Sequence, residues 1–169
     1  MDFLRFVMFA TLAAIGYGIA HDLVTAHVAV EYFTVHHPRL VASTSPIVMA
    51  LLWGVLATFW FGAGLGVLVG AANLLGRAPR LEWPLVRSGF LKTLVGLWVS
   101  ALLVLLGVYA AAGLVPAIKR GPSFESDRRL VAVAVTHNWS YTAGGGCGFA
   151  LAGWVVVRRR KLARAARAS

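Results

Sequence analysis

Side chains that can bind a metal ion or carry a proton are concentrated in one segment of this sequence. Residues 21–38 hold four of the five histidines and two of the six acidic residues, Asp22 and Glu31. The fifth histidine, His137, stands in an otherwise uncharged stretch. Imidazole nitrogens and carboxylate oxygens suit zinc, iron or copper, and they also form proton relays within membranes. The pattern therefore indicates a His/carboxylate site, but it specifies no reaction.

The histidine-rich segment alone can provide some of the ligands. If a helix continues past residue 20, His27 and Glu31 lie four positions apart and share one face. Asp22 then lies on another side, so one straight helix cannot bring all the carboxylates to one ion. His36 or His37 could fold back toward His27 through the turn that follows. The favoured interpretation of these three histidines is simpler: each donates a hydrogen bond to a carbonyl near the membrane interface.

A second arrangement joins the two ends of the chain. His137 lies about seven residues inside the fourth apolar run, roughly 10 Å at helical rise, so it reaches a depth similar to that of His21. A buried imidazole needs a polar partner. We therefore predict a site open to the outer face, with a divalent transition metal such as zinc as the candidate cofactor. Its predicted ligands are His21, Asp22, Glu31 and His137, and its predicted polar neighbours are Thr25, His27, His37, Ser140 and Tyr141.

Long uncharged runs must position these side chains. Hydrophobic residues make up 59% of the chain and charged ones 13%, against roughly 25% charged in soluble domains. Uncharged stretches longer than the roughly 20 residues of a membrane helix recur along it. We predict an all-α fold, an integral membrane four-helix bundle that forms a single domain over residues 1–169. The expected spans are about 3–20, 47–75, 93–115 and 130–157, followed by a basic tail at 158–169.

The distribution of basic residues predicts the orientation. Most of the 16 Lys and Arg residues lie on the side that holds both termini, and such residues favour the cytoplasm. The histidine segment and the loop 116–129 should then face outward, in a multi-pass protein of a bacterial inner membrane. The net charge of +10 is attributed to topology and anionic lipid headgroups, because no nucleic-acid-binding motif is present.

The first apolar run has an alternative interpretation. Arg5, an apolar core and the small residues Gly18 and Ala20 resemble a secretory signal with its cleavage site. Cleavage after Ala20 would leave three spans. The run is long for a signal core, however, and its hydrophobic pattern continues past this point, so a retained span is favoured.

Small residues indicate how the helices pack. Gly62, Gly66 and Gly70 follow one another at four-residue intervals and form a stripe that another helix can approach closely. Such a stripe serves packing within a bundle or, less often, a homo-oligomer or a larger membrane complex. The single cysteine, Cys147, lies in a glycine-rich part of a span and is interpreted as a small core residue.

The segment from Tyr17 to Pro38 resembles a family of small, uncharacterised bacterial four-span membrane proteins. The resemblance rests on His21-Asp22, on the run Glu31-Tyr32-Phe33-Thr34 and on His37-Pro38. The later His137-x-x-Ser140-Tyr141 followed by glycines and a basic tail fits the same pattern. The resemblance implies the four-span fold and no activity. In that family an arginine often stands at the position of His27, which favours the ligands His21, Asp22, Glu31 and His137.

Three functions fit these observations. The first is a binding or transport-related membrane protein with a metal or proton site. The second is a structural or accessory membrane subunit whose polar groups only stabilise the fold. The third, less favoured, is a membrane-embedded enzyme in which a metal-bound water reacts and Asp22 or Glu31 acts as base. An enzyme requires a cavity and converging ligands, whereas a structural subunit requires only that the polar groups satisfy one another.

Overall fold

The computed structural model describes residues 3–114 and 124–168 of the 169-residue chain, and these residues contain helices and no strand. Most of the predicted outer loop at 116–129 therefore lies outside the described residues. The helices are α1 (Phe3–Val28), α2 (Glu31–Thr34), α3 (Pro46–Leu56), α4 (Phe59–Leu74), α5 (Trp83–Leu114) and α6 (Phe124–Ala168).

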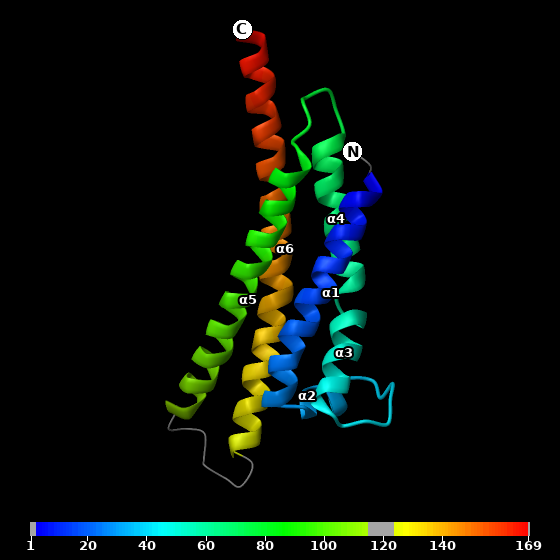
Figure 1. The fold of residues 1–169 in the computed structure, drawn as a ribbon. Helices are drawn as coiled ribbons and strands as arrows, with labels where there is room; N and C mark the ends of the chain where they lie inside the picture. Colours follow the sequence, from blue (N-terminus) through cyan, green and yellow to red (C-terminus); the bar gives the residue numbers. More distant parts are fainter. Residues whose placement is uncertain (1–2, 115–123, 169) are drawn as a thin grey trace.

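The long helices run up and down beside one another (Figure 1). α1 packs against both α3 and α4, α5 packs against α6, and α4 joins the two pairs by packing against α6. Both ends of the described chain lie at one end of the molecule, and the short helix α2 lies at the other (Figure 1). α1 and α4 run antiparallel, as do α5 and α6, whereas α4 and α6 run in the same direction (Figure 1).

Three helical stretches are long and apolar enough to cross a membrane: Phe3–Val28, Pro46–Leu74 and Trp83–Leu114. α6 is not among them, because its apolar part is interrupted by polar residues around His137 and by glycines. The all-helical fold and three candidate spans are thus observed, whereas the fourth span stays a prediction. The predicted bounds also shift: α1 continues to Val28 instead of ending near residue 20, and α5 begins at Trp83.

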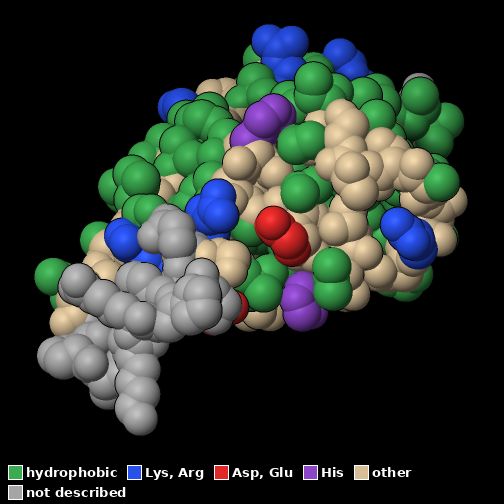
Figure 2. All heavy atoms as spheres, turned by 90° about the horizontal axis from the view of Figure 1, so that it is seen from below, with side chains coloured by type: hydrophobic (Ala, Val, Ile, Leu, Met, Phe, Trp, Pro, Cys, Tyr) green, Lys and Arg blue, Asp and Glu red, His purple; other side chains and the backbone are tan. Residues whose placement is uncertain are grey.

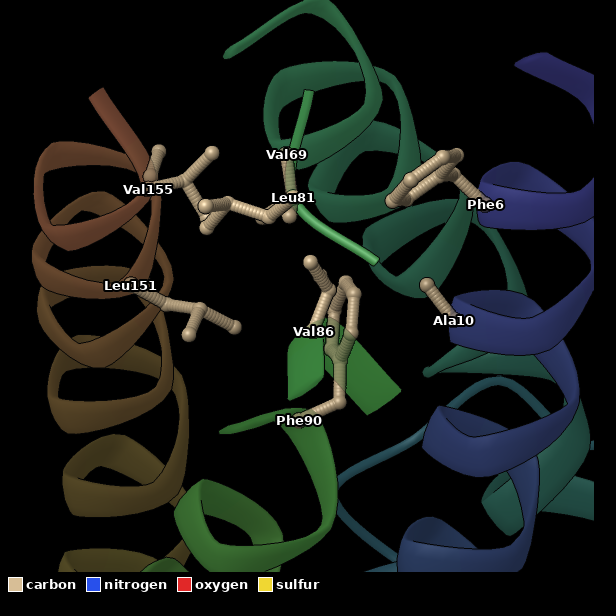
Figure 3. Packing of buried hydrophobic residues seen from close by; sticks show 9 residues of the cluster. Phe6, Ala10, Val69, Leu81, Val86, Phe90, Leu151 and Val155 are labelled. Carbon is tan, nitrogen blue, oxygen red and sulfur yellow. The ribbon is translucent and has the colours of Figure 1, made fainter. Parts of the chain in front are cut away.

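A hydrophobic core holds the helices together near the end that carries both termini. It draws side chains from α1, α4, α5, α6 and the connection before α5 (Figure 3). That connection is held by Asn73, whose side chain accepts a hydrogen bond from the Leu81 amide at 2.9 Å and donates one to the Leu81 carbonyl at 3.1 Å. The labelled core residues are Phe6, Ala10, Val69, Leu81, Val86, Phe90, Leu151 and Val155.

The glycine stripe of α4 is used within the chain. A Cβ atom at Gly66 would lie 2.6 Å from the Val7 Cα of α1, and one at Gly62 would lie 2.6 Å from the Ala14 Cβ. Such close backbone approach is what small residues permit between membrane helices. The stripe therefore packs on α1 within the chain, and a homo-oligomer stays a prediction.

The helical stretch Pro46–Leu74 is interrupted at Ala57 and Thr58, which separate α3 from α4. Gly18 of α1 faces this interruption: a Cβ atom there would collide with the Gly54 carbonyl oxygen and with the Thr58 side chain. Gly18 is one helical turn before Asp22. The close approach therefore fixes α1 against α3 and α4 directly beside the residues of the candidate site.

Candidate metal centre

His21 and Asp22 of α1 meet His137 of α6 inside the bundle. The Asp22 Oδ1 atom lies 3.0 Å from His21 Nδ1 and 3.2 Å from His137 Nε2. One donor atom from each residue lies within 4.8 Å of the other two, and all three residues are buried. Of the described residues, these form the only group of three or more His, Cys, Asp or Glu side chains close enough to hold a metal ion.

The three side chains meet because α1 does not end where the sequence suggested. α1 remains one helix through Val28. His21 and Asp22 therefore lie on its buried face, together with Gly18 and Thr25. His137 belongs to a buried face of α6, beside Thr136. The two imidazole rings contact each other edge to face, with 4.6 Å between their centroids.

Each histidine has a second hydrogen bond that orients its ring. His137 Nδ1–H donates to the Val133 carbonyl oxygen at 2.9 Å, since a carbonyl can only accept. His21 Nε2 lies 3.1 Å from the Ser140 Oγ atom. The Tyr17 hydroxyl in turn donates to that Oγ atom at 3.0 Å. Metal-binding histidines are usually oriented in this way by a carbonyl or other polar group on the nitrogen away from the ion.

The bond to Val133 has a consequence for charge. With its proton on Nδ1, a neutral His137 presents the lone pair of Nε2 toward the Asp22 carboxylate, 3.2 Å away. Two electron pairs at that distance repel unless a positive charge lies between or beside them. A second proton on His137 supplies that charge, and so does a metal ion. The pair therefore favours binding of a cation.

A cavity of about 100 Å³ adjoins the cluster. All three candidate ligands line it, together with Ser140 and Tyr141 of α6. The remaining wall is mostly apolar and aromatic, and it includes side chains from α1 through α6. A ligand in this cavity would therefore meet the cluster as its main polar group.

Two aromatic side chains of α2 cover the cluster on the side away from the termini. The Tyr32 and Phe33 rings lie 4.4 Å and 5.4 Å from the His137 ring, measured between centroids. Burial, and to a lesser extent the charge of Asp22, raises the pKa of the Tyr32 phenol above its ordinary value. Tyr32 therefore stays protonated at neutral pH and adds no negative charge beside the cluster.

The prediction of an outward-facing cluster is wrong, because the cluster lies buried within the bundle. The reason is the continuation of α1, which places Asp22 well before the helix end. The other predicted ligand, Glu31, is exposed at the start of α2 and is not part of the group. Histidine and acidic side chains do lie on the surface at the α2 end (Figure 2), but they are separate from the cluster.

The other predicted polar residues have diverse surroundings. His27 is exposed and its Nδ1–H donates to the Leu23 carbonyl at 2.6 Å, which is the simpler interpretation made for it. His37 donates to the Tyr32 carbonyl at 2.8 Å and lines the cavity. The buried Thr25 hydroxyl donates to the His21 carbonyl oxygen one turn earlier in α1 at 3.2 Å, and this bond does not involve the ligand atoms of the group formed by His21, Asp22 and His137.

Tyr17 is the site residue that sequence reasoning missed. Its hydroxyl donates to Ser140, and its ring stacks on His21 with centroids 5.7 Å apart. The available signal was its position, four residues before His21 and hence on the same helical face. Taken alone, a tyrosine inside a span is more simply interpreted as packing.

Comparisons with protein-family models, with curated proteins and with solved structures gave no match for this chain. The resemblance of the Tyr17–Pro38 segment to a bacterial membrane family therefore stays an expectation. The functional argument rests on the geometry of the site.

Proposed function

We propose that this chain is an integral membrane protein that binds a divalent transition metal ion, such as zinc, between α1 and α6. The ligands are His21, Asp22 and His137. Two imidazoles and one carboxylate form a donor set typical of zinc and non-haem iron sites. Zinc held by three protein ligands would keep a fourth position for water or another ligand, and the cavity that the three residues line would give room for it.

The hydrogen bond from His137 to the Val133 carbonyl is the observation that carries this proposal. It leaves His137 Nε2 as a lone-pair donor directed at Asp22, 3.2 Å away. It is also the kind of outer bond that holds a metal-binding imidazole in place. A site that served only to stabilise the fold would be better served by a histidine that donates from Nε2 to Asp22.

Proton binding is the second candidate, supported by the same pair of atoms. A doubly protonated His137 would donate to both Val133 and Asp22 and form a buried ion pair with the carboxylate. Such a pair could belong to a proton pathway or to an accessory subunit without any ligand. Metal analysis separates these functions from the first, because neither requires an ion other than a proton.

The test is the zinc content and zinc affinity of the purified protein in detergent, measured at pH 7.5 by elemental analysis and titration calorimetry. We expect about one zinc per chain. His21→Ala, Asp22→Asn and His137→Ala should each weaken binding by roughly 10- to 100-fold or more. His27→Ala and His36→Ala are matched controls on exposed histidines and should bind as the parent does. Equal binding by all five variants, or no binding by the parent, would refute the proposal.

The proposed function places the site in a membrane. α6 would form the fourth span: its Thr136 and His137 are buried, and the exposed Asn138 and Thr142 donate to carbonyl oxygens of α6 itself. Both termini would be cytoplasmic in a bacterial inner membrane, as the excess of basic residues on their side supports. An enzyme that activates a metal-bound water is a less favoured use of the same centre, with Asp22 as the available carboxylate.

A further inference from the structure

The candidate metal centre is buried, so an ion must pass through protein to reach it. Toward the end that carries both termini, the cavity beside the cluster borders the hydrophobic core, since Phe90 and Leu151 belong to both. Sideways the bundle would face lipid, and an unpaired charge in hydrocarbon is costly. The end at α2, which would meet the outer solution, is therefore the way in that costs an ion least.

Three hollows in the described part of the chain follow one another from the surface at the α2 end to the cluster. The outermost is open, has a volume of about 380 Å³ and is lined by the connection between α2 and α3. The next, of about 10 Å³, has roughly the space of one water molecule and shares Arg39, Leu40 and Val41 with the first. It also shares Phe33 and Trp53 with the cavity of about 100 Å³ at the cluster. The shared walls trace a route from the surface to the metal centre.

His37 lies beside the partition that Phe33 and Trp53 form between the two inner hollows. Its ring centroid lies 4.6 Å from that of Trp53 and 5.9 Å from that of Phe33, and it lines the cavity. Its Nδ1–H donates to the Tyr32 carbonyl oxygen at 2.8 Å. In the neutral ring Nε2 is then a lone-pair donor, and no described residue forms a hydrogen bond with it. Since neutral imidazole is the commonest metal ligand, His37 offers a metal-binding nitrogen on the route.

We infer that a metal ion reaches the centre from the α2 end along these hollows, and that His37 Nε2 binds the ion in transit between Phe33 and Trp53. This inference rests on the proposed metal site. His37 lies outside the group of three residues that can hold the ion together, so its contact ends when the ion arrives. An aromatic partition alone would oppose passage of a charge, and a ligand within it lowers that barrier.

The first experiment measures zinc association and zinc release by stopped flow, with a fluorescent zinc indicator and an excess of chelator. It uses the full-length protein in detergent at pH 7.5. His37→Phe keeps an aromatic ring beside Phe33 and Trp53 but removes the nitrogen. Because a transit ligand contacts the ion only on its way, both rates should fall together, by roughly tenfold or more, and the Kd for zinc should stay unchanged. His36→Phe, on an exposed histidine, is the matched control and should change nothing.

Two results with His37→Phe would overturn the transit role. A weaker Kd at an unchanged association rate would make His37 part of the final site. Unchanged rates in both directions would make it a packing residue. The thermal unfolding midpoint of the metal-free variant, compared with that of the parent, shows that the rates refer to a folded protein.

Arg39 tests the route with a variant that leaves the core untouched. Its side chain is exposed and lines both outer hollows, so its positive charge opposes entry of a cation. Arg39→Glu should therefore speed zinc association severalfold at low ionic strength, and added salt should reduce this gain by screening the charge. Arg160→Glu makes the same charge change on an exposed arginine at the opposite end (Figure 1) and should leave the rate unchanged. Equal acceleration by both variants, or by neither, would contradict entry at the α2 end.

The entry route and the metal site fail in different ways. Zinc binding whose rates respond to neither His37→Phe nor Arg39→Glu overturns the route and leaves the metal site standing. The absence of zinc binding in the parent protein refutes the metal site itself, and with it this inference.

Discussion

The carbonyl oxygen of Val133 determines how His137 can take part in the site. It accepts the Nδ1 proton, so the nitrogen nearest Asp22 is either a lone-pair donor or the second protonated nitrogen of an imidazolium. The neighbouring His21 differs, because the hydroxyl of Ser140 can donate to or accept from its Nε2 atom. His21 can therefore adapt its tautomer, whereas both ring nitrogens of His137 face oxygen atoms that accept hydrogen bonds.

The two histidines should be energetically coupled through Asp22. Each contacts the same Oδ1 atom, so loss of either changes what the other contributes. We expect His21→Ala and His137→Ala to be non-additive in thermal unfolding in detergent, with a coupling free energy of about 0.5–3 kcal/mol. The cycle should be measured with and without a chelator, since metal would enlarge the coupling. Additive losses that do not respond to chelator would mean that the histidines act separately.

At the scale of residues, the sequence predicted that His21 and Asp22 meet His137, but it also predicted Glu31 as a ligand, which lies outside the group. His21 and His137 could be paired because both lie at similar depths in apolar runs, and Asp22 follows directly from the first. Glu31 was included because helical spacing relates it to His27. That argument assumed one continuous helix, whereas α1 ends at Val28 and Glu31 begins α2 on the exposed end.

At the scale of helices, one arginine of α6 binds the end of α4 and the connection that follows it. Arg159 is buried and donates hydrogen bonds to carbonyl oxygens at and beyond the end of α4, at distances of 2.6–3.0 Å. Burial, and secondarily the charge of Arg80, lowers the pKa of this guanidinium, but an arginine remains protonated in proteins. The accepting residues are Ala72, Leu75, Ala78 and Pro79.

Arg159→Met should destabilise the bundle. The substitution keeps an apolar side chain of some length but leaves several carbonyl oxygens at the end of α4 without their donor. Loss of a buried partner costs about 1–3 kcal/mol, which should appear as a lower thermal unfolding midpoint in detergent. Arg160→Met is the matched control, because Arg160 is exposed. Equal midpoints for the two variants would show that the capping contacts contribute nothing.

Packing of α4 on α1 gives a second prediction about helices. Gly66→Leu should prevent close packing, because a Cβ atom there already lies 2.6 Å from the Val7 Cα. Gly64→Leu, whose Cβ position has nothing within 4 Å, is the appropriate control. Gly54, which the stripe alone would suggest as a control, is unsuitable because it packs equally closely on Ile19 of α1. The readout is the thermal midpoint in detergent, and similar values for Gly66→Leu and Gly64→Leu would contradict the assignment.

The helices show where sequence reasoning stops. Apolar runs predict long helices because the runs exceed the length of a membrane span. They do not distinguish Arg159 from Arg158 and Arg160, since a run of three arginines at a span end looks uniformly basic. Only the rotation of α6 against α4 selects the middle arginine as the buried one.

For the whole molecule, α1 is an integral part of the fold. Phe6 and Ala10 from its first half belong to the core with α4, α5 and α6, and its second half carries two of the proposed ligands. Removal of residues 1–20 as a signal peptide would expose that core to lipid or solvent. The structure therefore favours a retained first helix.

The proposed membrane topology predicts where reporters will be active. Fusions at the C-terminus should report a cytoplasmic location, whereas a fusion at Ser43, in the connection between α2 and α3, should report the outer side. An N-terminal tag should be retained on the mature protein, because α1 carries core residues and two of the proposed ligands. Loss of that tag during maturation, or a cytoplasmic signal at Ser43, would contradict this topology.

The proposed centre takes its ligands from the first and last helices, from positions 115 residues apart. A ribosome releases Asp22 long before it makes His137, so in a newly made α1 only the neighbouring His21 lies beside this carboxylate. The ion can be captured only after α6 has been inserted in the correct direction. Metal retention would then report that α6 is in place, because a chain cut short before α6 lacks His137, one of the three proposed ligands.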